Sequence, residues 1–181
     1  MKKFELTNEF ITNMFGTKLF RIRALVEFGD VEAGELGGYV EKESNLGHDD
    51  NAWVYDNAWV YGNARVYGDA QVSGDAWVYG NARVCGDALV CGNARVCGDE
   101  DYAYAHGFGS VNRTTTFFRL KDGGVGVRCG CFYGTLAQFR DKIRETHGET
   151  KKAQEYLMLA DLMELRFEED ENEVGNRKYV E

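Results

Sequence analysis

The chain of 181 residues contains no proline, although it contains 22 glycines. This combination excludes both a proline-rich linker and a collagen-like chain. Glycine adopts positive φ angles at little cost, so its abundance predicts many tight backbone corners between short strands. Hydrophobic residues make up 44% of the chain, which is enough for a packed core.

Positive charge is also scarce, because 21 Lys and Arg residues are opposed by 30 Asp and Glu residues and the net charge is −9. A protein that binds DNA electrostatically normally has a basic surface, so we expect no DNA partner. Residues 1–5 lack the apolar segment of a signal peptide, and no apolar run has membrane-spanning length. With five cysteines and no secretion signal, we expect reduced thiols, a cytoplasmic location and no membrane partner.

Eight consecutive six-residue units run from Asn51 to Gly98 without an insertion. They read NAWVYD, NAWVYG, NARVYG, DAQVSG, DAWVYG, NARVCG, DALVCG and NARVCG. The alanine and valine of each unit stand two apart, so they point to the same side of an extended strand. The Gly-Asn or Gly-Asp step between units supplies a corner. Three strands and three corners close a coil of eighteen residues, and stacked coils predict a parallel β-helix.

A meander of short antiparallel hairpins is the alternative, but hairpins do not require an unbroken six-residue register. Counting back in sixes places Leu46, Val40 and Gly34 at the alanine position and Leu36 at the valine position. We therefore expect an irregular opening coil from Leu36, because a repeat stack needs a cap at its ends. Upstream, residues 19–25 alternate between apolar and basic and are predicted to form one strand.

The regular repeat ends at Asp99, where other residues take the alanine and valine positions. Beyond it we predict two strands, within residues 114–120 and 125–131, joined by a glycine turn. Thr135 and Gln138 form a capping box for a first helix, and a second helix is predicted over about 151–167. The predicted organisation is a lead-in at 1–35, a β-helix at 36–104, a hairpin with two helices at 105–169 and an acidic tail at 170–181.

The tandem units, the opening segment 36–46 and the ending Gly130–Thr135 resemble small bacteriophage proteins with hexapeptide repeats, which are commonly labelled as transferases. This resemblance covers most of the chain and implies a left-handed parallel β-helix, a hand that the spacing alone does not give. It also implies a homotrimer, because β-helices of this family are typically trimers. The predicted fold class is therefore mainly β, a left-handed parallel β-helix with a small α+β C-terminal module.

Stacking in eighteens sorts the outward side chains of the repeat onto three faces. One face collects Trp59, Tyr61, Trp77, Tyr79 and Arg95; the next collects Arg65 and Arg83; the third collects Trp53 and Tyr55. Neighbouring coils lie about 4.8 Å apart, so Trp59 and Trp77 are expected to stack. An exposed aromatic ladder is unusual for a monomer, which favours a subunit interface. It also suits a ligand site between subunits, where the rings stack a base and the arginines hold phosphates.

Three histidines are present, and none lies within the eight units. Hexapeptide acyltransferases use a histidine as general base, so His106 is the catalytic candidate if this chain shares that activity. Asp69 and Asp87 stack at one corner and suit a cation, although capping of their own corners also explains them. Cys85, Cys91 and Cys97 fall on different faces, so we predict no metal site and no resident cofactor.

These residues do not make up a catalytic set, and we therefore expect a non-enzymatic, trimeric binding protein. Its specific form is a phage anti-defence protein that sequesters a nucleotide-type immune signal between its subunits. Arg113, Arg119 and Arg128 are further candidates for contacts to an anion. One alternative is an acyltransferase of the hexapeptide class that uses acyl-CoA, and the other is a scaffold that binds a host protein.

Overall fold

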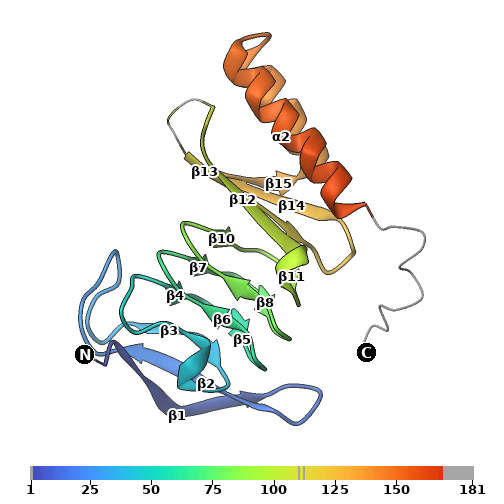
Figure 1. The fold of residues 1–181 in the computed structure, drawn as a ribbon. Helices are drawn as coiled ribbons and strands as arrows, with labels where there is room; N and C mark the ends of the chain where they lie inside the picture. Colours follow the sequence, from blue (N-terminus) through green and yellow to red (C-terminus); the bar gives the residue numbers. More distant parts are fainter. Residues whose placement is uncertain (1, 110, 112, 169–181) are drawn as a thin grey trace.

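The computed structural model describes residues 2–109, 111 and 113–168 of the chain. Figure 1 shows three parts that follow one another along a single direction. The N-terminal strands form one end, the repeat forms the middle, and a second sheet with two helices forms the other end. The tail predicted at 170–181 lies outside the described residues.

The middle part is a β-solenoid whose two-residue strands recur every six residues. They are β4 (Trp53–Val54), β5 (Trp59–Val60), β6 (Arg65–Val66), β7 (Gln71–Val72), β8 (Trp77–Val78), β9 (Arg83–Val84), β10 (Leu89–Val90) and β11 (Arg95–Val96). Parallel pairing groups them into three faces, β4-β7-β10, β5-β8-β11 and β6-β9. Trp59 pairs with Trp77, which confirms the eighteen-residue coil. The left hand implied by the resemblance stays a prediction.

The interior of the solenoid is built from the small apolar side chains of the repeat. Each unit's alanine, from Ala52 to Ala94, and each unit's valine, from Val54 to Val96, is fully buried. Full burial of a valine contributes about 1.5–3 kcal/mol, so these positions supply most of the driving force for coiling. The corners need glycine for two reasons, as Gly68 illustrates: its φ is +74°, and a Cβ there would lie 3.0 Å from the Gly86 nitrogen of the next coil.

The N-terminal residues form a small sheet that continues one face of the solenoid. Its strands are β1 (Phe4–Thr12), β2 (Lys18–Ala24) and β3 (Leu36–Val40), with β1-β2-β3 antiparallel and β3 parallel to β5. β2 confirms the strand predicted over 19–25, whereas β1 was not predicted. This region also covers Trp53, whose indole packs edge-on against Phe4 and Phe28 and is fully buried. Trp53 was predicted on an outward face, in register with Gln71, but the N-terminal residues cover it and it is not exposed.

The predicted register of the opening coil was wrong, by two residues. Val40 pairs with Val60 and Leu46 with Val66, so both stand at the valine position, twenty residues before their partners instead of eighteen. Leu36 pairs with Arg23 of β2 and is 49% exposed, outside the inward row. The two additional residues follow Leu46, after the short helix η1 (Glu43–Asn45). There the Asp50 carboxylate accepts hydrogen bonds from Gly68 N and Ala52 N and closes the corner.

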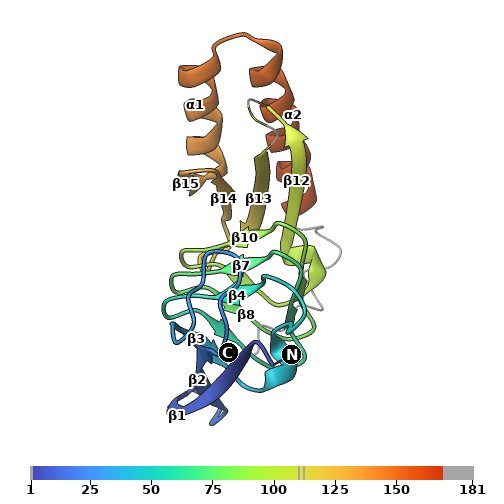
Figure 2. The ribbon, with the colours of Figure 1, turned by 90° about the vertical axis from the view of Figure 1, so that its left-hand side faces the viewer.

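The C-terminal part is a four-stranded antiparallel meander covered by two helices. Its elements are η2 (Asp99–Asp101), β12 (Tyr102–Phe108), β13 (Arg113–Arg119), β14 (Val125–Cys129), β15 (Phe132–Thr135), α1 (Leu136–His147) and α2 (Lys151–Phe167). The predicted hairpin is thus only the central half of the sheet, and residues 102–104, assigned to the β-helix, belong to β12. Both helices are confirmed, and Thr135 and Gln138 form the predicted capping box. Figure 2 shows α1 and α2 side by side above this sheet.

The C-terminal sheet closes the open end of the solenoid. The buried Thr116 hydroxyl accepts a hydrogen bond from the backbone amide of Leu89, in β10, at 2.9 Å. The Tyr102 hydroxyl donates a hydrogen bond to the Arg83 carbonyl at 2.6 Å. Leu120 forms an isolated antiparallel β-bridge with Ala94. The exposed backbone edge of a sheet invites further pairing, so these contacts act as a cap. Over the part of the chain that the structure describes, neither helix is long and apolar enough to cross a membrane.

Candidate functional site

One row of side chains crosses the sheet β1-β2-β3-β5-β8-β11 on its outer face. Backbone pairing places Arg21, Tyr39, Trp59, Trp77 and Arg95 in register on successive strands. We call this row the ladder. Its two tryptophans come from the repeat, whereas Arg21 and Tyr39 come from the N-terminal strands. These two residues were not predicted to join the row, because they lie outside the hexapeptide units.

The two tryptophan rings of the ladder are stacked, and a guanidinium lies at each end of the row. The Trp59 and Trp77 ring centroids lie 4.4 Å apart with their planes inclined by 7°, which confirms the predicted stacking. The Arg95 guanidinium lies 3.9 Å from the Trp77 ring centroid, and the Arg21 guanidinium lies 5.0 Å from that of Tyr39. Both tryptophans are partly exposed. Tyr39 is buried, so the exposed aromatic surface of the ladder is that of Trp59 and Trp77.

A second aromatic row runs beside the first. The Tyr61 and Tyr79 rings stack at 5.3 Å with an interplanar angle of 8°. Burial raises the pKa of Tyr61 to about 12 and also raises the pKa of Tyr79. Both phenols therefore keep their protons at neutral pH and remain hydrogen-bond donors.

The three arginines predicted as ligand contacts differ in their surroundings. Arg95 is committed to the protein, because its Nη1 donates to the carbonyls of Asp75 at 2.9 Å and Ala94 at 2.8 Å. Arg95 therefore caps Trp77 in this structure, and its predicted contact with a ligand stays a prediction. Arg65 and Arg83 pair in register on the adjoining face and are exposed, with no described carboxylate at ion-pair distance. These two remain free to bind an anion.

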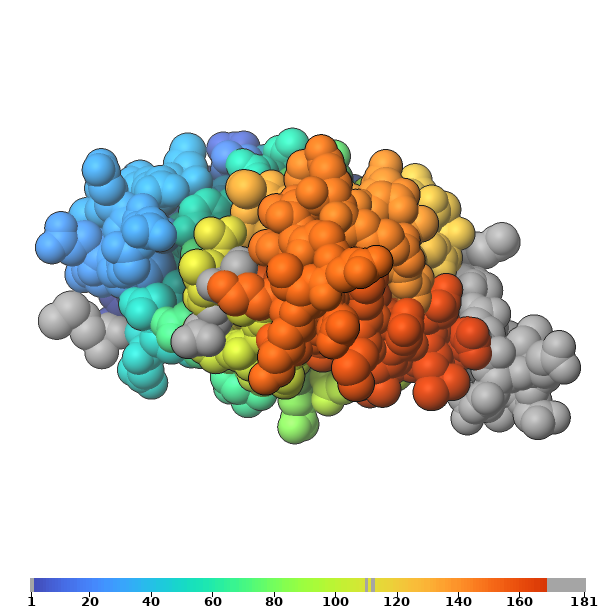
Figure 3. Space-filling view, turned by 90° about the horizontal axis from the view of Figure 1, so that it is seen from above, coloured from blue at the N-terminus to red at the C-terminus, as the bar shows by residue number. Residues whose placement is uncertain are grey.

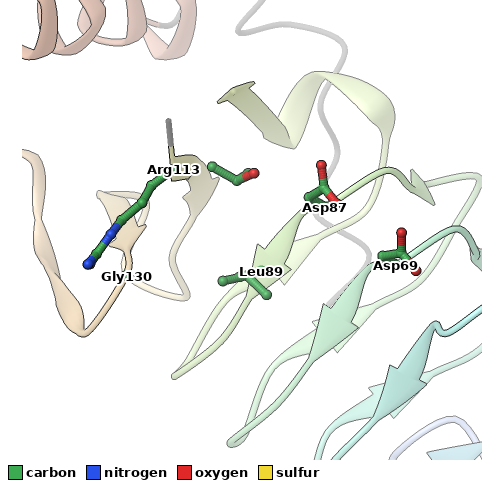
Figure 4. Close-up of a pocket in the computed structure, with 6 residues that line it drawn as sticks. Asp69, Asp87, Leu89, Arg113 and Gly130 are labelled. Carbon is green, nitrogen blue, oxygen red and sulfur yellow. The ribbon is translucent and has the colours of Figure 1, made fainter. Parts of the chain in front are cut away.

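A cavity of about 390 Å³ lies between the solenoid corner and β13, and His106 contacts two of the residues that line it, Asp87 and Thr114. The His106 Nδ1 lies 2.9 Å from Thr114 Oγ1 and 3.7 Å from Asp87 Oδ2. Both partners approach the same ring nitrogen, so the three groups do not form a nucleophile–base–carboxylate triad. The cavity is also lined by Asp69 and Arg113. Figure 4 shows Arg113 extending toward Gly130, away from the two aspartates, so the charged groups do not converge.

The other metal and anion candidates are dispersed. Cys85, Cys91 and Cys97 follow β9, β10 and β11, which belong to three different faces. Within residues 2–109, 111 and 113–168, no three His, Cys, Asp or Glu side chains are grouped to hold a metal ion. Arg119 donates to the carbonyls of Gly123 and Phe167 and therefore has a structural role.

Comparison with known protein families supports the solenoid. The YdcK Beta solenoid repeat matches residues 58–74, 70–86 and 76–92, which lie within β5 to β10. No curated protein matches the chain. The resemblance to phage hexapeptide proteins therefore stays a prediction, and the matched segments show that the chain contains a β-solenoid repeat domain of the YdcK type.

Proposed function

We propose that the protein is a non-enzymatic, homotrimeric binding protein whose ladder face lies at the subunit boundary and holds a ligand there. The observation that carries this proposal is the stack of Trp59 and Trp77, partly exposed and capped by Arg95. An aromatic surface of this extent is costly to leave in water, and contact with a second subunit removes it from water.

The chemistry of this face suits a nucleotide-type ligand. The ring faces of Trp77 are covered by Trp59 and Arg95, so a base would pack its planar face against the exposed edges of the indole and phenol rings, an edge-to-face arrangement worth about 0.5–1.5 kcal/mol for an aromatic pair. The hydroxyls of Tyr61 and Tyr79 are protonated donors within the same surface. Arg65 and Arg83, across the adjoining corner, supply charge for phosphates. In its specific form, the protein is a phage anti-defence factor that sequesters a nucleotide immune signal in the host cytoplasm.

Charge-removing variants test this proposal without disturbing the rings. A panel of mono-, di- and cyclic nucleotides is screened by thermal shift and titration calorimetry against the wild type, and against a variant carrying Arg65→Gln and Arg83→Gln. We expect at least one nucleotide to bind, and the variant to bind it at least tenfold more weakly. Arg144→Gln, which removes an exposed charge on α1, is the matched control. The proposal is wrong if no nucleotide binds or if the control loses as much affinity.

Acyl transfer from acyl-CoA is a second candidate, favoured by the environment of His106. Its Nδ1 is hydrogen-bonded to Thr114 Oγ1 at 2.9 Å, which leaves Nε2 as the nitrogen that could act as a general base. A free-thiol assay with acyl-CoA and a panel of amine and hydroxyl acceptors tests it. The release of CoA should depend on acceptor and disappear in His106→Gln; no release with any acceptor argues against this candidate.

A scaffold that binds a host protein is the third candidate, favoured by one face of α2. Met158, Leu162 and Leu165 are 71%, 54% and 67% exposed and follow one another at helical spacing. Replacing Trp59 and Trp77 with alanine separates the scaffold from the ligand site. If the wild type binds no nucleotide and the variant no longer forms a trimer, the scaffold is supported. If the variant stays trimeric but no longer binds a nucleotide that the wild type binds, the ligand site is supported.

A further inference from the structure

A second cavity, of about 220 Å³, lies in the C-terminal module between the sheet and the helices. Figure 3 looks down on this end of the molecule, where residues of the two helices form the outer surface. The cavity has an aromatic wall formed by Phe132, Phe139 and Tyr156. It is separate from the ladder and independent of the function proposed there.

The charge of this cavity is opposite to that of the protein. Arg113, Lys142 and His147 line it, and none of its lining residues is Asp or Glu. The chain as a whole has a net charge of −9, so basic side chains grouped without acidic partners are unexpected. Basic groups beside an apolar wall attract a ligand that is both anionic and apolar.

The basic side chains are available to such a ligand. Arg113 has no described carboxylate at ion-pair distance, and its guanidinium lies over Gly130, where a Cβ would be 1.9 Å from Nη1. Glycine at position 130 therefore makes room for this side chain. Lys142 pairs with Glu145 at 2.9 Å, but both side chains are exposed, and such pairs contribute little. His147 stacks on Tyr156, with ring centroids 5.9 Å apart, at the C-terminus of α1.

The volume limits the ligand to about one ring. An apolar cavity of about 150 Å³ is enough for benzene, so 220 Å³ leaves space for a single acidic substituent. We propose that this cavity binds a small aromatic carboxylate or phosphate, with its ring against Phe139 and Tyr156 and its anionic group toward Arg113 and Lys142.

Two cysteines provide an internal reporter for occupancy. Cys129 and Cys131 both line the cavity, and Cys129 accepts a hydrogen bond from the Thr115 hydroxyl at 3.2 Å. A bound ring would shield these thiols from alkylation. Cys85 and Cys91 lie on the solenoid, outside this cavity, and should react at an unchanged rate.

The test uses the full-length protein with benzoate, phenyl phosphate and neutral benzyl alcohol as probes. By titration calorimetry we expect at least one anion to bind at least tenfold more tightly than benzyl alcohol, and to slow iodoacetamide labelling of Cys129. Arg113→Gln and Lys142→Gln should each weaken the binding of that anion at least fivefold. Arg144→Gln, on the same helix as Lys142, should leave it unchanged. The proposal is overturned if no anion binds at concentrations up to 10 mM, which corresponds to a binding free energy of about −2.7 kcal/mol. It is also overturned if benzyl alcohol binds as tightly as the anions.

Discussion

Trp59 and Trp77 lie one coil apart with their ring centroids 4.4 Å from each other and their planes nearly parallel. The solenoid imposes this arrangement, because residues eighteen apart occupy equivalent positions on paired strands. Two rings held at the spacing of a sheet lose little conformational freedom when a planar group packs against their exposed edges, since Trp59 and Arg95 cover the faces of Trp77. This pre-organisation is the physical basis of the binding function proposed for the ladder face.

Removing one rung of the ladder should reduce the free energy of unfolding. Trp77→Ala deletes a stacked pair, worth about 0.5–1.5 kcal/mol, and a cation–π contact with Arg95, worth about 0.5–1 kcal/mol. We expect a loss of about 1–2.5 kcal/mol in urea unfolding. Leu162→Ala, an exposed apolar position on α2, is the control and should cost less than about 0.5 kcal/mol. Equal effects of the two substitutions would contradict the stacking account.

The inward valines should be far more sensitive than an exposed valine. Val78→Ala removes two methyl groups from a fully buried site, and we expect a loss of about 2 kcal/mol, including the cavity left behind. Val111→Ala, at a position that is 58% exposed, should change stability by less than about 0.5 kcal/mol. Chemical denaturation of both variants measures the difference. If Val78→Ala leaves the free energy of unfolding unchanged, the buried interior is not what stabilises the solenoid.

The cap between the solenoid and the C-terminal sheet depends on one buried hydroxyl. Thr116→Val keeps the shape of the side chain but leaves the amide of Leu89 without its acceptor, at a cost of about 1–3 kcal/mol. Thr12→Val, on an exposed position of β1, is the matched control. Hydrogen exchange should show faster exchange at Leu89 in the Thr116 variant. Unchanged exchange there would show that the sheet does not close the solenoid through this contact.

Stability should fall in alkaline solution through the buried phenols. Burial raises the pKa of Tyr61 to about 12, above its ordinary value of 10.0, so the folded state holds this proton more tightly than the unfolded state. The resulting stabilisation is complete below pH 10 and is lost as pH rises toward about 12. Tyr61→Phe should flatten this decline, measured as the urea midpoint between pH 8 and pH 11.5. A decline of unchanged steepness in the variant would show that Tyr61 is not its source.

The repeat could be predicted because its structure is determined by residues that are close together in the sequence. A fixed period places Val78 inward and Trp77 outward whatever the rest of the chain does, and both placements are confirmed. The capping box of Thr135 and Gln138 is equally local. The burial of Trp53 was not predictable in this way, because the residues that pack against it, Phe4 and Phe28, are distant in sequence.

The features that the sequence analysis missed depend on contacts between distant segments. The register of Val40 is set by two additional residues after Leu46, which a count in sixes cannot reveal. Arg21 and Tyr39 extend the ladder only because β2 and β3 pair beside β5. The contacts of His106 with Asp87 and Thr114 likewise join a solenoid corner to a separate sheet.

Native mass spectrometry of the protein, purified from its expression host and then exposed to the nucleotide panel, tests the central claim most directly. The account predicts a complex of three 20.4 kDa chains that carries additional mass corresponding to a nucleotide-type ligand. The Arg65→Gln and Arg83→Gln variant should keep the trimer and lose the additional mass. A monomer, or a trimer that stays empty with every nucleotide, would contradict the assignment of the ladder face as a ligand site between subunits.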